Sequence, residues 1–421
     1  MIYLSIGSNI GNRRKNLANA VFFLKNRIFK NLKCSIILET ECILLPESPK
    51  EWDMPFLNMI VWGECDLSPE NLLKAIKEIE HEMGRPKFYE KWAPRIIDID
   101  ILFFNNITID TPTLKIPHPE IHNRPFLQHL LSLSGHSKFT SSTHPEVFLK
   151  SFTLAPKLVG IINVTPDSFS DGGIYLDADN AVARAIEMAN EGADIIEIGA
   201  QSTRPGAKIL ALDQEYDRLK PVLAGLRNQK NLIEISIDSF CPIVIKKVLK
   251  EYQVDWINDV KGDLDDSTLR LIADHNCGII LMHSLSVPPT KDLIIDPNLD
   301  PIDVILNWGE AKLKKLHSLG FNSDKIILDP GLGFSKSIYQ NMQIIQNVSN
   351  LKNLGCKIMV GHSRKSFMAA FTNQAASKRD IETIAISAAL KNKVDYLRVH
   401  NVRDHMRFFV AQNCLNNGDY A

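Results

Sequence analysis

The sequence predicts an α+β domain followed by an α/β barrel of eight strands. One observation is the length, because 421 residues are too many for one ordinary hydrophobic core and indicate two domains. Another is a pattern in the second part of the chain, where short apolar runs, typical of buried strands, pass directly into polar residues. Stretches of helical character separate these runs, as in a (β/α)₈ barrel. The runs cover 158–164, 194–200, 234–238, 256–260, 278–283, 326–331, 357–363 and 396–401.

The composition is typical of a soluble globular protein. The chain is 45% hydrophobic and 23% charged, and its net charge of −1 creates no global field that would attract nucleic acid or an anionic membrane. Its seven cysteines are scattered and include no Cys-x-x-Cys pair, which indicates free thiols in a reducing compartment. The sequence has neither a signal-peptide pattern nor an apolar run of about 18 residues. We therefore expect a cytoplasmic protein whose anion sites are local, with neither nucleic acid nor membrane as a partner.

The first part of the chain mixes strands and helices without regular alternation, which is typical of a compact α+β domain. A strand over 2–6 precedes Gly7, which we interpret as a plain turn residue. Ser68 and Pro69 provide a cap and a first residue for a helix that ends at Gly84. The other predicted elements are a helix over about 13–28, strands over 35–39 and 56–62, and a proline-bearing loop over 40–55.

Two aspartates that follow this helix are the first sign of chemistry. Asp98 and Asp100 are two residues apart on a predicted strand, so their carboxylates project from the same face. Such charges repel each other unless a cation lies between them, although a solvated strand face is the alternative for an isolated pair. Because Arg85 and Arg95 lie in the neighbouring loop and the ligands are all oxygens, the segment favours Mg²⁺ with a bound polyphosphate.

Further residues extend this pattern: Phe56-Leu57-Asn58, Gly84-Arg85, Trp92-x-Pro94-Arg95-x-x-Asp98-x-Asp100, Pro117-His118-Pro119 and Asn123-Arg124-x-Phe126. Together these motifs resemble 6-hydroxymethyl-7,8-dihydropterin pyrophosphokinase over about residues 1–133. The resemblance implies a ferredoxin-like α+β domain. The segment 45–50 departs from the proline-glycine turn that is usual in this family.

The same resemblance implies the roles of the individual residues. Asp98 and Asp100 would bind two Mg²⁺ ions that bridge ATP and the pterin hydroxymethyl group. Asn58 would contact the edge of the pterin ring, and Phe56 and Phe126 would stack on its faces. Arg85 and Arg95 would be catalytic as well as ATP-binding. The expected ATP-binding residues are Arg85, Lys87, Trp92, Arg95, His118 and Arg124.

Residues 135–156 are rich in Ser, Thr and His and show little periodicity, so we interpret them as a linker between a domain at 1–134 and a domain at 157–421.

Polar residues end the predicted strands of the barrel, and the carboxyl ends of such strands meet at one mouth. For each single Asp or Asn, helix capping is the alternative interpretation. Several carboxylates and amides together favour a flat heterocycle with adjacent donors and acceptors, and basic residues after strands seven and eight indicate a phosphate site. The residues at the mouth are Asn163, Thr203, Arg204, Asp238, Asn258, Asp329, Lys365, Arg398 and His400.

Five motifs in the barrel carry a second resemblance. They are the segment 163–173, Ser202-Thr203-Arg204-Pro205-Gly206, Asp329-Pro330-Gly331-x-Gly333-Phe334, Ser363-Arg364-Lys365 and Arg398-Val399-His400. These motifs closely resemble dihydropteroate synthase from about residue 158 to the end of the chain. Departures from the family pattern occur at Gln201, at Ser335 and at His283-Ser284.

This second resemblance again implies roles. Four residues would hold the pterin ring: Asp238, Asn258, Asp329 and Lys365. Four would bind its pyrophosphate: Asn163, Arg204, Arg398 and His400, with a Mg²⁺ ion on Asn163. The p-aminobenzoate pocket would be lined by Thr203, Pro205, Arg364 and Ser366, and the loops 165–173 and 202–206 would close over the site. Lys365 and Arg398 would be the catalytic residues.

The two resemblances together imply two consecutive steps of folate biosynthesis. The first domain would transfer pyrophosphate from ATP to 6-hydroxymethyl-7,8-dihydropterin and release AMP, and the barrel would condense the product with p-aminobenzoate to 7,8-dihydropteroate. Two alternatives remain for the barrel, a pterin-binding methyltransferase and a catalytically silent pterin-binding scaffold. Barrels of this kind commonly form homodimers, so a homodimer through the barrel is also expected.

Overall fold

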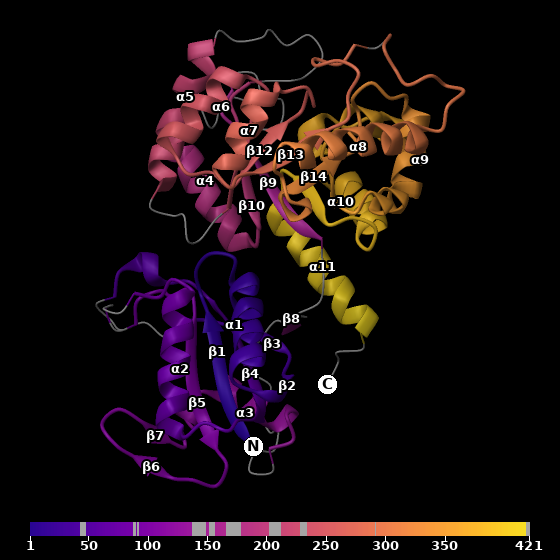
Figure 1. Ribbon diagram of the computed structural model, residues 1–421. Helices are drawn as coiled ribbons and strands as arrows, with labels where there is room; N and C mark the ends of the chain where they lie inside the picture. Colours follow the sequence, from indigo (N-terminus) through magenta and orange to yellow (C-terminus); the bar gives the residue numbers. More distant parts are fainter. Residues whose placement is uncertain are drawn as a thin grey trace. The chain divides into compact units, whose positions relative to one another are not determined.

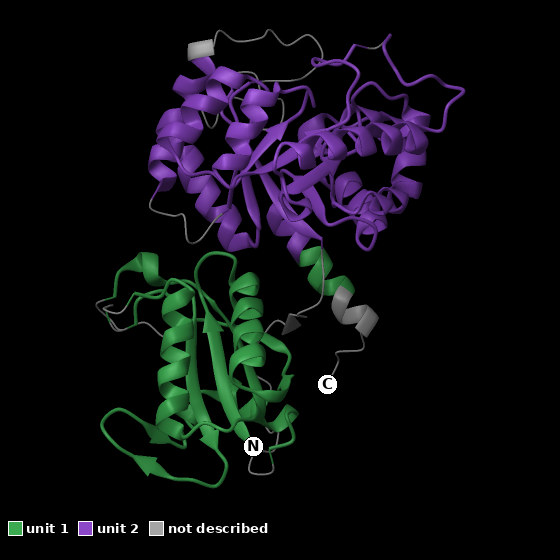
Figure 2. Cartoon of the chain, in the orientation of Figure 1, with its two compact units in different colours: residues 1–154, 407–421 green, residues 155–406 purple. Residues whose placement is uncertain are grey.

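The structure is a computed structural model that describes residues 1–42, 48–86, 90, 92–136, 149–150, 156–165, 178–201, 212–227, 234–290 and 292–417, with backbone only for 149–150, 212–213 and 413–417. The chain divides into two compact units (Figure 2). The first unit comprises residues 1–154 and 407–421, and the second comprises residues 155–406. Among the described residues, no helix combines the length and the apolar character needed to cross a membrane.

An antiparallel sheet of six strands forms the first unit. The strand order is β5-β1-β4-β3-β8, and β2 also pairs with β4. The succession β1-α1-β3-β4-α2-β5 is the β-α-β-β-α-β arrangement of ferredoxin-like folds, which confirms the predicted fold class. The strands are β1 (Ile2–Ser8), β2 (Lys30–Cys34), β3 (Ile37–Thr40), β4 (Phe56–Glu64), β5 (Asp98–Phe104) and β8 (Leu149–Lys150), and β6 (Ile109–Asp110) and β7 (Lys115–Ile116) form a separate hairpin.

Two helices of this unit, α1 and α2, begin directly after a residue whose side chain caps them. Helix α1 (Arg13–Arg27) starts after Asn12, whose side chain accepts a hydrogen bond from the Lys15 backbone at 3.0 Å. Helix α2 (Pro69–Glu82) starts after Ser68, whose hydroxyl accepts from the Asn71 backbone, and its buried stripe faces the core. Both helices pack against the sheet (Figure 1). Helix α3 is Pro125–Leu133, and two short 3₁₀ turns are η1 (Lys50–Trp52) and η2 (Pro119–Ile121).

Three differences from the expected elements concern the sheet. Strand β1 continues to Ser8, so Gly7 is a strand residue and the prediction of a turn is wrong. Strand β2 was not predicted because it is mostly exposed and lacks an apolar face. Strand β8 lies within the expected linker, and its backbone pairs with β3.

One face of this sheet carries both apolar packing and the aspartates. Helix α3 packs there through Leu127 and Leu130 against Leu102 of β5 and Ile60 of β4. Leu102 is separated from Asp100 by one residue, so the two side chains project from the same face. The polar half of this face remains open beyond the α3 contact.

The second unit is a closed barrel of eight parallel strands, which confirms the predicted architecture (Figure 1). The strands follow one another around the barrel in chain order, and β16 pairs with β9 to close it. They are β9 (Lys157–Asn163), β10 (Ile195–Gly199), β11 (Glu234–Asp238), β12 (Trp256–Asp259), β13 (Gly278–Met282), β14 (Ile326–Asp329), β15 (Lys357–Val360) and β16 (Tyr396–Val399).

Helices cover the barrel, and among the helices whose first residues and caps the structure describes, three have an acidic or hydroxyl cap. Asp265, Asp300 and Ser337 accept hydrogen bonds at the starts of α7, α8 and α9. The helices are α4 (Ala178–Glu191), α5 (Leu212–Leu226), α6 (Pro242–Glu251), α7 (Asp266–Asp274), α8 (Pro301–Ser318), α9 (Ile338–Asn347) and α10 (Asp380–Leu390); the connections between β13 and β16 also include η4 (Ser323–Lys325), η5 (Val348–Leu354), η6 (Ser366–Ala370) and η7 (Ala376–Lys378). Helix α11 (Val402–Asn417) begins in this unit, and its residues from 407 on are grouped with the first unit.

Large side chains fill the interior of the barrel. Trp256 lies against Gly278 on the neighbouring strand, where an added Cβ would come within 2.3 Å of the indole ring. The interior is therefore a packed core, and the open space is at its ends. The cluster consists of Val159, Ile195, Trp256, Ile280, Ile327, Met359 and Tyr396.

Candidate active sites

A pocket opens on the polar half of the sheet in the first unit. It contains about 610 Å³ of space, including solvent at its mouth, which is within the usual range for a small-molecule site. Its walls combine aromatic, basic and acidic side chains from β1, β3, β4, β5 and the start of α3. The lining residues are Ser5, Gly7, Thr40, Glu41, Cys42, Phe56, Asn58, Trp92, Arg95, Asp98, Asp100, Arg124 and Phe126.

Strand register brings the polar residues of this pocket together. Gly7 of β1 pairs with Asn58 on one side and with Asp98 on the other, and Ser5 pairs with Asp100. A Cβ added at Gly7 would lie 2.8 Å from Asn58 Oδ1 and 3.4 Å from the Phe56 ring. The missing side chain at Gly7 therefore leaves the space that Asn58 faces. Sequence inspection overlooked this role because it interpreted Gly7 as a turn residue.

The amide of Asn58 has a defined orientation. Its Nδ2 donates to Thr40 Oγ1 at 2.8 Å, so its Oδ1 lies on the side of Gly7. Asn58 is 8% exposed, which means that a ligand in the pocket replaces water at a nearly buried acceptor. The Arg95 guanidinium lies over the Phe56 ring at 5.4 Å, so the same wall offers an aromatic face and a positive charge.

Asp98 and Asp100 differ in their electrostatic environments. Burial raises the pKa of Asp98, but the charges of Arg95 and Arg85 outweigh burial and hold that pKa below its ordinary value. Burial and the neighbouring Asp98 charge raise the pKa of Asp100. Among the described residues, no Lys, Arg or His lies within ion-pair distance of Asp100, so this carboxylate is the one that a cation would stabilise.

Arg85 lies beneath the strand rather than in the pocket. Its Nη1 contacts Asp98 Oδ1 at 2.5 Å and Glu80 Oε1 at 2.6 Å, and the residue is 6% exposed. Glu80 Oε1 also accepts from the backbone N–H of Ile99 at 2.8 Å, between the two aspartates. Glu80 and Arg85 together therefore hold β5 and Asp98 in place. The sequence did not identify Glu80, since one Glu in an amphipathic helix gives no signal of such a contact.

Of the other residues expected to bind ATP, some line the pocket and some do not. Trp92 and Arg124 line the pocket, whereas His118 caps the 3₁₀ turn η2 by accepting from the Glu120 backbone at 3.3 Å. His118 is nevertheless close enough for its charge to lower the pKa of Asp100, against the effect of burial. Lys87 lies outside the described residues.

At the mouth of the barrel, a partly buried arginine joins two carboxylates. Arg398 donates to Asp238 Oδ2 at 2.8 Å and to Glu197 Oε1, although 160 or more residues separate each partner along the chain. Burial raises the pKa of Asp238 to about 7 against the opposing charge of Arg398, and Glu197 raises it further. Two carboxylates thus share one guanidinium.

Glu197 also orients Asn258. Its Oε2 accepts from Asn258 Nδ2 at 2.9 Å and from Ser236 Oγ at 3.3 Å, and Glu197 is fully buried. Asn258 Oδ1 is buried without a hydrogen-bond partner among the described residues. It is therefore an acceptor available for an N–H group of a ligand. Glu197 was not identified from the sequence because its partners belong to three other strands.

Asp329 and Lys365 form the other side of the mouth. Asp329 accepts from the backbone N–H groups of Gly331 at 2.7 Å and Gly361 at 3.2 Å. Burial raises its pKa, while the charge of Lys365 opposes this shift. Burial in turn lowers the pKa of Lys365 to about 8, and its Nζ donates to the Leu332 carbonyl at 2.6 Å.

Small residues leave room between the polar side chains. At Gly199, an added Cβ would lie 3.6 Å from Asn163 Oδ1 and 3.7 Å from Asp238 Oδ2, so these two side chains approach each other across this glycine. At Gly361, an added Cβ would lie 3.1 Å from Asp329 Oδ2 and 3.5 Å from Arg398. The structure therefore brings these expected residues to one mouth. Helix capping does not account for Asp238 or Asp329, since Cys241 and Ser337 are the caps of the helices that follow.

The remaining expected residues are at the rim or outside the described residues. His400 Nδ1 lies 2.9 Å from Ser363 Oγ, and Ser366 begins the 3₁₀ turn η6 after Lys365. Lys336, which no motif assigned a role, is buried and contacts His283 Nδ1 at 3.0 Å. Burial lowers the pKa of Lys336 to about 7. Thr203, Arg204 and Pro205 lie outside the described residues, as do 166–173 and 202–206 of the expected loops.

The oxygen atoms of Asp98 and Asp100 fit a hard cation that takes some of its ligands from the protein and others from a substrate. Within the described part of the chain, no group of three or more His, Cys, Asp or Glu side chains is arranged to hold a metal ion. The site provides two carboxylates, and the pKa of one of them, Asp100, is raised. This small number of protein ligands fits Mg²⁺, because Mg²⁺ takes its other ligands from phosphates and water.

Comparisons with known proteins cover both units. Residues 3–134 match the family model of 7,8-dihydro-6-hydroxymethylpterin-pyrophosphokinase, and residues 159–400 match that of pterin binding enzymes. The chain is 38% identical over 434 residues to a folate synthesis bifunctional protein of Chlamydia caviae, with 97% of each chain covered. It is 32% identical to one of Arabidopsis thaliana, with 96% of this chain and 94% of that protein covered.

A solved structure is similar to the barrel. The dihydropteroate synthase of Anaplasma phagocytophilum, with bound 6-hydroxymethylpterin-monophosphate, is 32% identical and covers 62% of this chain and 100% of its own. The TM-score is 0.56.

Proposed function

The chain belongs to the family of folate synthesis bifunctional proteins, and from this premise we propose which residues carry its two activities. The first domain is a pyrophosphokinase that transfers pyrophosphate from ATP to 6-hydroxymethyl-7,8-dihydropterin and releases AMP. The barrel is a dihydropteroate synthase that condenses the resulting pterin pyrophosphate with p-aminobenzoate and releases pyrophosphate. The alternatives of a methyltransferase and a silent scaffold are therefore not needed.

In the first domain, Asn58 and two aromatic residues bind the pterin. The Oδ1 of Asn58 faces the space over Gly7, which is the observation that carries this assignment. An acceptor fixed in this way selects a ring edge that presents N–H donors. Phe56 and Phe126 line the same pocket and provide the stacking faces.

The triphosphate of ATP extends toward the basic end of this pocket, which Arg95, Arg124 and Trp92 line. Lys87 and His118 are assigned to the phosphates as well. Arg85 acts through Asp98 instead of touching ATP, because it does not line the pocket and its guanidinium is held by Asp98 and Glu80. We assign Arg85 as a positioning residue.

Asp98 and Asp100 would hold Mg²⁺. A Mg²⁺ ion supplies charge neutralisation for the phosphates and for the developing charge of the transferred group. Arg95 and Arg85 keep Asp98 ionised, while Asp100 gains the most from a cation because its pKa is raised by burial and by Asp98. Transfer of pyrophosphate needs such positioning and neutralisation more than a protein nucleophile.

At the barrel mouth, four residues bind the pterin ring. Asn258 Oδ1 accepts from a ring N–H, and the observation that carries the assignment is that this oxygen has no hydrogen-bond partner in the described part of the chain. Asp238 and Asp329 accept further ring donors, and Lys365 donates to a ring acceptor. Because Glu197 holds the Asn258 amide through Nδ2, this amide cannot reverse its donor and acceptor without losing that bond.

The pyrophosphate of this substrate lies toward strands β15, β16 and β9. Arg398, His400 and Arg204 stabilise the charge on the departing pyrophosphate, and Asn163 would hold a Mg²⁺ ion that adds positive charge there. Asp238 and Asp329 stabilise the positive charge that spreads over the pterin. Thr203, Pro205 and Ser366 bind p-aminobenzoate, whose amine attacks the exposed methylene carbon as the bond to pyrophosphate breaks.

Omission of single substrates tests this assignment of both activities. The full chain is given 6-hydroxymethyl-7,8-dihydropterin, ATP, Mg²⁺ and p-aminobenzoate, and AMP, pyrophosphate and 7,8-dihydropteroate are measured. We expect AMP without p-aminobenzoate, and pyrophosphate only when p-aminobenzoate is present. Release of pyrophosphate without the amine would contradict the condensation mechanism.

A further inference from the structure

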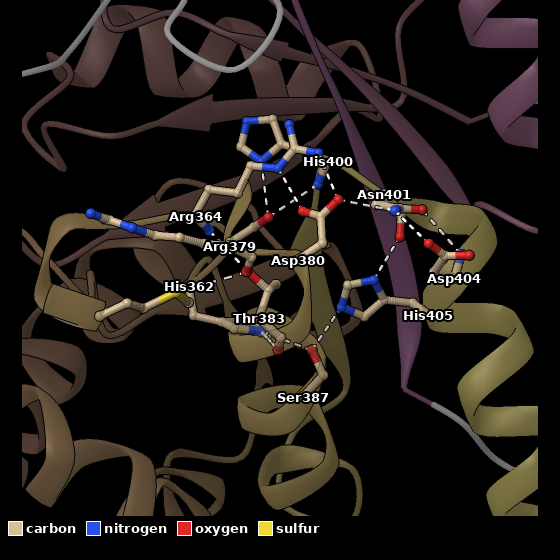
Figure 3. Close-up of polar contacts among 12 residues, drawn as sticks. His362, Arg364, Arg379, Asp380, Thr383, Ser387, His400, Asn401, Asp404 and His405 are labelled. Atoms are coloured by element: carbon tan, nitrogen blue, oxygen red, sulfur yellow. Dashed lines mark hydrogen bonds and ion pairs between the residues drawn. The ribbon is translucent and has the colours of Figure 1, made fainter. Parts of the chain in front are cut away.

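We propose that Asp380, the first residue of α10, is a positioning residue for the condensation and holds in place the two turns that carry Lys365 and His400. The inference rests on the roles proposed above for these two residues. Figure 3 shows Asp380 between Arg364, in the turn after β15, and Asn401, in the turn after β16. Neither Asp380 nor Asn401 belongs to a motif that indicated the site.

A bidentate ion pair connects Asp380 to the first turn. Arg364 Nε donates to Asp380 Oδ1 at 2.7 Å, and Arg364 Nη2 donates to Asp380 Oδ2 at 2.9 Å. The side chain of Arg364 is 12% exposed, so this pair is largely shielded from water. The guanidinium is thus bound to α10, which differs from the p-aminobenzoate contact expected for Arg364.

The backbone of the same turn is strained and is held from the same helix. Arg364 has φ of +59°, a left-handed conformation that is unfavourable for a residue other than glycine. Its N–H donates to Thr383 Oγ1 at 3.1 Å, and Arg379 Nη1 donates to the Lys365 carbonyl at 2.9 Å. Such a conformation persists only where the surroundings determine it several times over. The start of α10 does so here, and it thereby sets the direction in which Lys365 leaves the turn.

Asp380 reaches the second turn through Asn401. Asn401 Nδ2 donates to Asp380 Oδ2 at 3.1 Å and to Asp404 Oδ2 at 2.9 Å, and Asn401 Oδ1 accepts from the Asp404 backbone at 3.1 Å. Every polar atom of this amide is therefore used, and its orientation is defined. His400 precedes Asn401, and its ring and backbone nitrogens contact Ser363 Oγ. One carboxylate thus connects both turns of the proposed pyrophosphate site.

A buried chain of hydrogen bonds connects Ser387 of α10 to His362, in the turn after β15, and to His405 of α11 (Figure 3). His362 Nε2 lies 2.8 Å from Ser387 Oγ, which lies 2.9 Å from His405 Nε2, and His405 Nδ1 lies 2.6 Å from the Asn401 carbonyl. Since a carbonyl can only accept, His405 donates from Nδ1, Ser387 donates to His405, and His362 donates to Ser387. All three residues are fully buried. The direction of every bond in the chain is defined, so α10 cannot easily shift relative to either turn.

Substitution of the ion pair in the full chain tests the proposal. We expect Asp380→Asn and Arg364→Gln each to lower kcat of the condensation about tenfold to a hundredfold, because Lys365 and His400 lose their fixed geometry. KM for p-aminobenzoate should change less than about twofold, and the double variant should be no worse than either single variant. Asp380→Glu, which retains the carboxylate, should recover part of the rate.

The controls separate positioning from folding. The same preparations should form AMP at the rate of the wild type, since the pyrophosphokinase site lies in the other unit. Glu187→Gln removes one of the two carboxylate partners that Arg184 has on α4, at a side chain that is 52% exposed, and should leave the condensation unchanged. If Asp380→Asn does not fold, Arg364→Gln and Asp380→Glu provide the same comparison.

Three results would overturn the proposal or its premise. Wild-type turnover by Asp380→Asn would exclude a positioning role. A tenfold or larger rise in KM for p-aminobenzoate in Arg364→Gln alone would make Arg364 a substrate ligand. If the wild type itself formed no dihydropteroate from supplied pterin pyrophosphate, the proposed function of the barrel would fail and not merely the role of Asp380.

Discussion

In the pocket of the first unit, Asp98 and Asp100 share one face of a strand, and arginines compensate only the first of them. At the barrel mouth, by contrast, Arg398 pairs with Asp238 and Glu197, and the charge of Lys365 opposes the shift at Asp329. The first site thus needs an external cation to be complete, whereas the second is balanced mainly by its own side chains. The difference agrees with the chemistry, because ATP arrives with Mg²⁺ and the pterin ring has donors and acceptors of its own.

The largest effect is expected at the site that lacks internal compensation. Asp100→Asn should lower AMP formation by a factor on the order of 10³ or more, because Mg²⁺ loses one of its two carboxylates. Condensation of supplied pterin pyrophosphate should stay at the rate of the wild type. Assays of both reactions on one preparation, with Asp110→Asn as an exposed control, measure this. Normal AMP formation would remove Asp100 from the metal site.

Loss of an internal cation should be almost as severe in the barrel. Lys365→Ala should lower the condensation rate about 10²-fold to 10³-fold, since Asp329 loses its compensating charge and the ring loses a donor. The pyrophosphokinase reaction should not change. Lys315→Ala, which removes a surface partner of Asp266, is the matched control. An equal loss of both activities would contradict the separation of the two sites.

The shifted pKa values predict how the condensation depends on pH. Asp238 has a pKa raised to about 7 and must be ionised to accept a ring N–H, so kcat/KM should rise with pH through this value. Lys365 has a pKa lowered to about 8 and must be protonated to donate, so kcat/KM should fall above it.

The resulting dependence of kcat/KM on pH is bell-shaped, and Asp238→Asn tests whether its acidic limb belongs to Asp238. The variant should retain the alkaline limb and lose the acidic one, and kcat/KM measured between pH 5 and 10 provides the test. An acidic limb that persists in the variant would mean that another group titrates there.

The smallest effects are expected from substitution of Gly7 and Gly199, each of which leaves space beside the polar side chains of its site. Gly7→Ala would bring a Cβ within 2.8 Å of Asn58 Oδ1, so KM for 6-hydroxymethyl-7,8-dihydropterin should rise about tenfold. Gly199→Ala would bring its Cβ no closer than 3.5 Å to Asp238, and condensation should fall less than about threefold. Steady-state kinetics of both reactions compare the two variants. A larger effect at Gly199 would show that the barrel mouth has less free space than the pocket.

Much of the fold follows from local patterns. The eight apolar runs coincide with β9 to β16, and α2 begins at the Ser68 cap and Pro69, because period and capping act over a few neighbouring residues. The weak elements were missed for the same reason. Strand β2 has no apolar face and exists only through its pairing with β4.

The candidate sites were predicted less completely. Motifs identified Asp98, Asp100, Asp238, Asn258 and Lys365, whose residue types and positions at strand ends are visible in the sequence. Their roles remain predictions. The partners that hold them were not visible, since Glu80, Glu197 and Asp380 resemble ordinary charged residues of strands and helices.

The sequence by itself determined the succession of strands and helices, the positions of the motifs and the membership of both domains in known families. The tertiary structure alone decided which arginines face a substrate space and which are held by carboxylates, as for Arg85 and Arg364. The physical reason is distance along the chain: Arg398 and Glu197 are 201 residues apart and meet only when the barrel closes. Local periodicity carries no information on such a pair, because it reports only on residues that are neighbours along the chain.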